Sequence, residues 1–189
     1  MKRSTRAIAI AGGVFLTGVI GCVGGGYAIE PDVTYETARD MRARPEAVMA
    51  HLTSADGLRA WWAHADTSGG PPMTVRPRSA RAGEGMVVTF EADGEVLETW
   101  TLERSAPDRV DYAVDFAGLF AVHRTLTVST TPRGCRVTWR ETGRVDDPLA
   151  RWMLVATPPD EVVDNFDRAL VALERAATSA SDPIEAATP

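Results

Sequence analysis

The feature that most constrains the fold is a run of strand-like segments at roughly ten-residue spacing. The segments cover residues 73–78, 85–91, 95–104, 109–116, 121–130 and 135–145. Turn-forming residues separate them, including Asp93-Gly94 and Pro132-Arg133-Gly134. Strands joined by such short turns pair antiparallel, because parallel pairing needs a crossover of about a dozen residues or more. The sequence therefore predicts an antiparallel meander.

Other segments flank this run. A strand is expected over residues 34–42, followed by a helix that begins at Arg44-Pro45-Glu46, since proline in the first helical turn loses no hydrogen bond. A second short helix is expected over residues 58–63 and carries Trp61-Trp62. Thr157-Pro158-Pro159-Asp160 marks the start of a long last helix. Its apolar positions recur at helical spacing and form one stripe: Val163, Phe166, Leu170, Leu173 and Ala177.

The N-terminal residues 1–29 are predicted to direct the chain to a membrane. Lys2, Arg3 and Arg6 precede an uncharged stretch over residues 7–29. Val19-Ile20-Gly21-Cys22 resembles a bacterial lipobox, which implies cleavage before Cys22 and its lipidation, with Gly24-Gly25-Gly26 as a flexible link. Alternatively the stretch is one transmembrane helix about 34 Å long, or a buried core helix. Both membrane interpretations put the following domain on the extracytoplasmic side.

Charge and cysteine content exclude several classes of function. The net charge is −6, and residues after 29 hold 20 − 3 = 17 basic against 26 acidic groups. Such an acidic domain is a poor partner for nucleic acid. Cys135 is left without a disulfide partner if Cys22 is in or on the membrane, and the three histidines belong to no metal-ligand pattern. We therefore expect no metal or cofactor.

Three charged residues share the apolar face of their strands. Because residues i and i+2 of a strand point to one side, Glu98, Arg124 and Glu141 point where their apolar neighbours point. Pairing Thr130 with Cys135 across the 131–134 turn places Arg124 opposite Glu141. A similar count around the preceding turns places Val114 between Arg124 and Glu98. The charges therefore form either the polar part of a ligand pocket, where Arg124 meets a carboxylate or a carbonyl, or a structural salt bridge; a catalytic carboxylate is a third possibility.

The order of these elements resembles the START-like superfamily of polyketide cyclases/dehydrases and lipid-transport proteins. The matching pieces are residues 44–52, Leu58-Arg59-Ala60-Trp61-Trp62, the strand run and residues 165–170, and the resemblance covers residues 33–177. It implies an α+β helix-grip fold. In that fold a curved antiparallel sheet of about seven strands surrounds a long C-terminal helix, with two short helices after the first strand and a cavity between sheet and helix.

The resemblance and the inward charges together predict a membrane-tethered domain, residues 30–177, that binds a small hydrophobic or amphipathic molecule. The expected ligand-binding residues are Glu98, Trp100, Tyr112, Val114, Arg124, Trp139, Glu141, Phe166 and Leu170. Trp61-Trp62 and Trp152-Met153 are candidates to cover the cavity, and residues 178–189 are expected to be a disordered tail. Two alternatives stay open: a cyclase or dehydrase acting on a carbonyl-bearing ligand, and an envelope interaction domain without a ligand. No catalytic residue is assigned.

Overall fold

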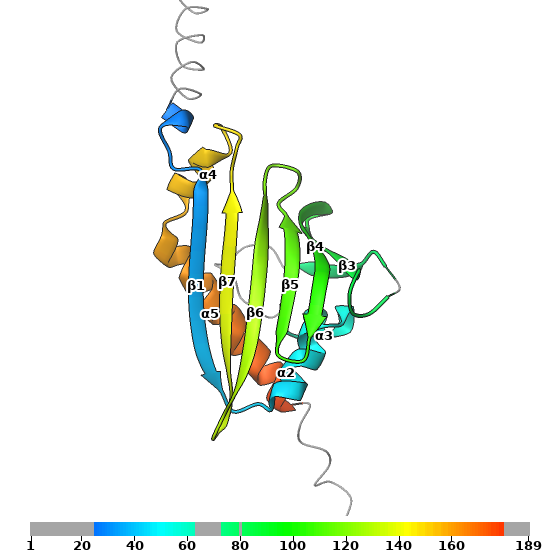
Figure 1. Cartoon of the computed structure of the whole chain (residues 1–189). Helices are drawn as coiled ribbons and strands as arrows, with labels where there is room; N and C mark the ends of the chain where they lie inside the picture. Colours follow the sequence, from blue (N-terminus) through cyan, green and yellow to red (C-terminus); the bar gives the residue numbers. More distant parts are fainter. Residues whose placement is uncertain (1–24, 63–72, 80, 180–189) are drawn as a thin grey trace, which may run out of the picture.

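The structure, a computed structural model, describes residues 25–62, 73–79 and 81–179. Seven strands form one antiparallel sheet in the order β1-β7-β6-β5-β4-β3-β2 (Figure 1). Their bounds are β1 Asp32–Met41, β2 Thr74–Pro77, β3 Val87–Ala92, β4 Glu95–Ala106, β5 Arg109–Asp115, β6 Ala121–Thr131 and β7 Gly134–Arg144. The six predicted strands of the run and the predicted first strand are all present, with ends that shift by a few residues.

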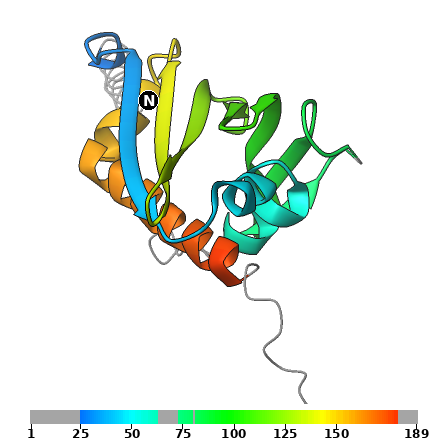
Figure 2. The same cartoon turned by 60° about the horizontal axis from the view of Figure 1, so that its bottom comes forward.

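The helices lie on one side of this curved sheet (Figure 2). Their bounds are α2 Pro45–Leu52, α3 Ala55–Trp62, α4 Arg151–Ala156 and α5 Pro159–Ser179. The apolar stripe of α5 faces inward, where Phe166, Leu170 and Leu173 are buried against the concave face of the sheet. The Tyr112 hydroxyl donates a hydrogen bond to the Leu52 carbonyl and so joins β5 to α2. The predicted helix-grip fold is confirmed.

The predicted strand register is confirmed on one side of Arg124 and wrong on the other. Arg124 pairs with Glu141 across β6 and β7, as predicted. On the other side Arg124 pairs with Tyr112, and Val114 pairs with Trp100 instead of Glu98. The turn between β5 and β6 holds residues 116–120, and a bulge interrupts β4 between Leu102 and Arg104. The resulting shifts are of two residues, so every side chain keeps its predicted face.

The segment before β1 and the segment between β7 and α5 differ from expectation. The predicted flexible glycine link is wrong for Gly25 and Gly26, because a Cβ on either would collide with Trp152 or Pro148. Those glycines allow residues 25–29 to pack directly on the segment before α4. Helix α4, which was not predicted, follows the 146–150 turn.

The terminal predictions fall mostly beyond the described part of the chain. Helix α5 runs to Ser179, two residues past the predicted domain end, and residues 180–189 lie outside the described residues. Most of the predicted anchor, including Cys22, also lies outside them. Within residues 25–62, 73–79 and 81–179, none of the helices is both long enough and apolar enough to span a membrane.

Candidate functional site

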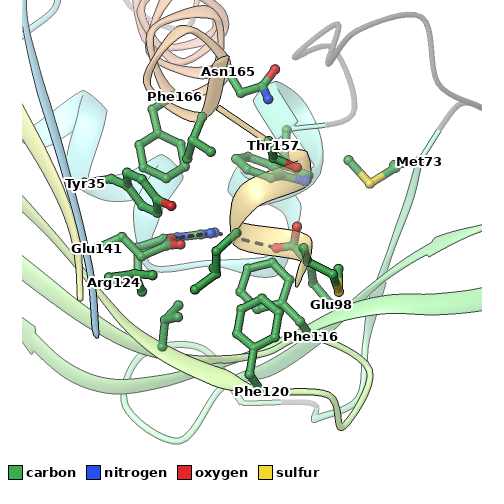
Figure 3. A pocket seen from close by; sticks show the side chains of 16 residues that line it. Tyr35, Met73, Glu98, Phe116, Phe120, Arg124, Glu141, Thr157, Asn165 and Phe166 are labelled. Atoms are coloured by element: carbon green, nitrogen blue, oxygen red, sulfur yellow. Dashed lines mark hydrogen bonds and ion pairs between the residues drawn. The ribbon is translucent and has the colours of Figure 1, made fainter. Parts of the chain in front are cut away.

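A cavity of about 280 Å³ lies between the concave face of the sheet and the helices (Figure 3). Its walls come from the start of β1, β4 and β6, the end of β7, the turn between β5 and β6, the helices α3, α4 and α5, and Met73 before β2. Apolar side chains dominate the lining, which consists of Val33, Tyr35, Trp62, Met73, Glu98, Phe116, Phe120, Val122, Arg124, Glu141, Met153, Leu154, Thr157, Val162, Asn165 and Phe166. The volume lies just below the range of about 300–1,000 Å³ that is usual for drug-sized ligands.

Arg124 forms the polar centre of this cavity wall, and its side chain is only 2% exposed. Its guanidinium carbon lies 4.2 Å from the ring centre of Trp100 and 4.9 Å from that of Trp139. The rings of Trp62 and Phe166 follow at 5.6 and 5.8 Å. Aromatic faces attract a cation at such distances, and the attraction strengthens when water is absent. The rings therefore stabilise a charge that burial would otherwise oppose.

Glu141 pairs directly with Arg124. One carboxylate oxygen, Oε2, accepts a hydrogen bond from Nε at 2.7 Å and lies 2.6 Å from Nη2 in an ion pair. Both side chains are buried, so the pair is held in a surrounding of low polarity, where charge-assisted hydrogen bonds are short and strong. The predicted partnership of Arg124 with Glu141 is therefore a direct ion pair.

The third guanidinium nitrogen of Arg124, Nη1, has no hydrogen-bond acceptor among the described residues. Nη1 lies 3.7 Å from Glu98 Oε2, which is within ion-pair distance but too long for a hydrogen bond. This nitrogen is buried and has no hydrogen-bond partner among the described residues. The indole nitrogen of Trp62, on the cavity lining, is in the same condition. Buried donors are nearly always paired, so these two donors call for acceptors that the described side chains do not supply.

The pKa of the Glu98 carboxyl group is raised by its surroundings. Its Oε2 accepts a hydrogen bond from Trp100 Nε1 at 2.7 Å. Burial raises the pKa of Glu98, and the negative charge of Glu141 adds to this, while Arg124 and the Trp100 hydrogen bond oppose it. The net shift is upward, so Glu98 retains its proton more readily than an ordinary glutamic acid does.

Tyr35 joins the site from the first strand. It pairs with Glu141 in the register of β1 and β7, and its ring packs edge-on against Phe166 at 6.4 Å. Burial and the nearby Glu141 raise the pKa of Tyr35, so the phenol stays neutral. Sequence reasoning missed this residue, although alternation along the first strand carried a signal that places Val33 and Tyr35 on one face.

The predicted ligand-binding residues separate into two groups. Glu98, Arg124, Glu141 and Phe166 line the cavity. The other five are fully buried but lie outside its lining: Trp100, Tyr112, Val114, Trp139 and Leu170. The reason is steric, because large aromatic rings fill the centre of the grip and leave space only at one end of the sheet.

The candidate covering residues also differ in their positions. Trp61 is fully buried, whereas Trp62 lines the cavity. Met153 lines the cavity from α4, while Trp152 is on the outside of that helix and partly exposed. His123 is exposed on the face of β6 opposite to Arg124, and its Nδ1 lies 3.5 Å from Glu103 Oε2.

The arrangement suits non-covalent binding of an organic molecule. Within the described residues no group of three or more His, Cys, Asp or Glu side chains is placed to hold a metal ion. The polar groups of the wall are one arginine, two carboxyl groups, the Asn165 amide and the hydroxyls of Tyr35 and Thr157, and aromatic rings surround them. Such a wall can orient a hydrogen-bonding group at one end of an apolar ligand and can exchange a proton through Glu98.

Comparison with known proteins identifies the family. A family model described as "Polyketide cyclase / dehydrase and lipid transport" matches residues 32–178. The chain belongs to this family, as its sequence resemblance implied. Among curated proteins, none matches the chain in sequence.

Solved structures share the fold at low sequence identity. A protein from Chromobacterium violaceum superposes with a TM-score of 0.58 at 20% identity, covering 76% of this chain and 96% of that one. A Staphylococcus aureus protein of unknown function has a TM-score of 0.59 at 14% identity, with coverage of 79% and 96%. The di-domain ARO/CYC StfQ of the steffimycin biosynthetic pathway has a TM-score of 0.55 at 13% identity, covering 80% of this chain and 52% of that one. These likenesses show the fold and leave the chemistry to the site itself.

The buried ion pair makes a testable contribution to stability. Glu141→Leu leaves Arg124 buried without its partner, and we expect the free energy of unfolding to fall by about 3–5 kcal/mol. The double variant Arg124→Met with Glu141→Leu removes both charges, so it should recover most of that loss. Urea unfolding of the two variants and the wild type measures this. A double variant no more stable than the single one would contradict the ion-pair assignment.

The raised pKa of Glu98 predicts a pH dependence of stability. Above its ordinary value of 4.5, the unfolded chain releases this proton while the folded chain retains it. Folding therefore becomes less favourable as the pH rises from there through the raised pKa. Glu98→Gln removes this effect, so its stability relative to the wild type should increase over that interval and stay constant below it. Urea unfolding across pH tests this, and a difference independent of pH would show that Glu98 titrates normally.

Proposed function

We propose that this chain is a membrane-tethered member of its family that binds a small, mainly apolar molecule in the cavity beneath α4. The bound molecule presents a hydrogen-bond acceptor to Arg124. One observation carries the proposal: Arg124 lines a cavity of about 280 Å³, and its buried Nη1 has no hydrogen-bond partner among the described residues. A purely structural salt bridge would use this donor as well.

The charges around Arg124 favour a neutral ligand. Glu141 already neutralises the guanidinium, and Glu98 lies only 3.7 Å from Nη1. A ligand carboxylate at Nη1 would therefore add a second negative charge beside a guanidinium that Glu141 already neutralises. A carbonyl oxygen avoids this repulsion, and a protonated Glu98 can donate a second hydrogen bond to it. We accordingly favour a ketone, aldehyde, ester or amide over the carboxylate that the sequence also allowed.

The membrane tether is supported by the sequence of the N-terminal segment. Residues 7–24 contain no charged side chain, follow three basic residues, and include the lipobox-like Val19-Ile20-Gly21-Cys22. Either lipidation of Cys22 or a single membrane-spanning helix would hold the domain on the extracytoplasmic side. The family description includes lipid transport, which suits a ligand that is sparingly soluble in water.

A matched pair of probes tests the ligand chemistry. The methyl ketone of naphthalene and the naphthoate anion share the ring and have nearly the same shape, but differ in charge. We expect the full chain in lipid nanodiscs to bind the ketone at least about tenfold more tightly than naphthoate, a difference of about 1.4 kcal/mol. Titration calorimetry with empty nanodiscs as the blank measures both.

Two variants locate the binding in the cavity. Arg124→Met with Glu141→Leu removes the donor while keeping the charges balanced, and it should weaken ketone binding about tenfold. Arg140→Met is the matched control, because Arg140 is the neighbouring residue on the exposed face of β7. Tighter binding of naphthoate than of the ketone, or equal losses in both variants, would contradict the proposal.

A reaction on the ligand is the second candidate function, and Glu98 is the observation that favours it. A carboxyl group that retains its proton beside a cavity is able to act as a general acid towards a carbonyl oxygen. Native mass spectrometry of the chain as purified from its cells separates the two functions. Release of a single unchanged metabolite supports a carrier, whereas a mixture of substrate and product supports an enzyme.

A further inference from the structure

The exposed apolar side chains gather at one end of the molecule. Seven large apolar side chains of the described residues are exposed: Tyr27, Leu97, Leu119, Leu149, Trp152, Met153 and Val155. Five of them belong to residues 25–29 and the 149–155 segment, beside the start of β1. Leu119 is in the turn between β5 and β6. Leu97 is near the start of β4, two residues before Thr99, which pairs with Asp115 at the end of β5. All seven therefore lie at the end of the sheet that contains the cavity.

The opposite end has a different character. It comprises the turns between β4 and β5 and between β6 and β7, together with helix α2 and the C-terminal end of α5 (Figure 1). None of the seven exposed apolar side chains belongs to this end within the described residues. An apolar surface confined to one end marks a contact with an apolar partner, because monomeric soluble domains scatter such residues singly.

The N-terminal segment joins the described chain at this same end. Gly26 packs against the Pro148 carbonyl and Gly25 against the Trp152 ring, where a Cβ would lie 2.7 Å from the ring. Arg151 joins α4 to this segment as well, since its Nη1 donates a hydrogen bond to the Ile29 carbonyl at 3.5 Å. Gly25, the residue that follows the uncharged stretch 7–24 in the sequence, therefore lies beside α4. If that stretch is in or on a membrane, α4 is held next to the membrane surface.

Helix α4 is also the cavity wall on this side. Met153 lines the cavity and is 45% exposed. Leu154 and Thr157 complete this part of the lining. Helix α4 thus forms one wall of this partly open cavity, and its exposed side chains Trp152, Met153 and Val155 are apolar.

We propose that the end of the domain formed by residues 25–29, α4 and the 116–120 turn rests on the surface of a lipid bilayer. An apolar ligand then passes between the bilayer and the cavity beneath α4 without crossing water. This inference rests on the proposed function, since it assumes the membrane tether. Asp115, Asp146 and Asp147 are exposed at the same end. The contact is therefore driven by apolar burial and gains nothing from anionic lipids.

Tryptophan fluorescence in vesicles tests the contact. Four of the five tryptophans are buried, while Trp152 is partly exposed on α4. The full chain is placed in phosphatidylcholine vesicles whose acyl chains are brominated near the headgroup, and its emission is compared with that in unbrominated vesicles. We expect quenching that falls at least twofold in Trp152→Phe. Adding phosphatidylserine or salt should leave it unchanged.

A tryptophan at the far end provides the matched control. Trp152→Phe combined with Arg133→Trp moves the exposed ring to the turn between β6 and β7, where we expect no quenching beyond that of Trp152→Phe. Equal quenching from residue 133 would contradict the proposed orientation. Absence of Trp152 quenching in a chain that sediments with the vesicles would overturn the bilayer contact and leave the tether and the ligand proposal standing. Failure of the chain to sediment with vesicles would overturn the tether and this contact together.

A second variant tests the passage of ligand. Val155→Glu places a charge on the outer face of α4, away from the cavity lining. We expect it to slow transfer of the naphthyl ketone from vesicles to the protein at least tenfold, with equilibrium binding unchanged. Ser129→Glu, at the far end of β6, should change neither quantity. Unchanged transfer in Val155→Glu would contradict passage beneath α4, as would formation of dimers through this end in place of vesicle contact.

Discussion

The buried charge of Arg124 is the constraint on which the rest of the site depends. A guanidinium held almost entirely out of water is costly unless it is paired and surrounded by favourable dipoles. Glu141 supplies the pair through one short hydrogen bond and a second close ion-pair contact, and the rings of Trp100 and Trp139 supply aromatic faces within 5 Å. The large tryptophans of the grip thereby serve two purposes, since they fill the core and also stabilise the cation. What remains unsatisfied is one donor, Nη1, and it lies where the packing leaves a cavity.

The cavity and the outer surface share one end of the fold. The opposite end is closed by short turns, and the centre is filled by aromatic and aliphatic side chains from β4 to β7 and from α5. Among the described residues, helix α4 and the turn that carries the stacked rings of Phe116 and Phe120 border the cavity end. In our proposals Arg124 therefore binds the polar group of the ligand inside the cavity, whereas α4 and the 116–120 turn contact the membrane and let the ligand pass.

Patterns within single strands, turns and helices predicted the features that depend on neighbouring residues alone. Alternation along each strand placed Glu98, Arg124 and Glu141 on the concave face, and the short 131–134 turn fixed the pairing of β6 with β7. The apolar stripe of α5 followed from helical spacing. The register of β4 against β5 did not, because a bulge changes the count without leaving a clear mark in the sequence.

Long-range geometry decided the remaining features. Tyr35 reaches the site because the first strand pairs with the last, a contact that no turn specifies. Helix α4 has six residues, too few for helical periodicity to be recognised, so its place on the cavity was not predicted. Trp100 and Trp139 share the predicted face with the charges, yet they pack against the Arg124 guanidinium and do not line the cavity. Which inward residues line space and which fill it depends on three-dimensional packing.

A structure of the chain purified from its own cells, determined without added ligand, addresses the central claim most directly. The account predicts density for a small non-protein molecule in the cavity, with an oxygen at hydrogen-bond distance from Arg124 Nη1. The account is contradicted if the side chains close over the cavity and Nη1 donates its hydrogen bond to an acceptor from the protein itself.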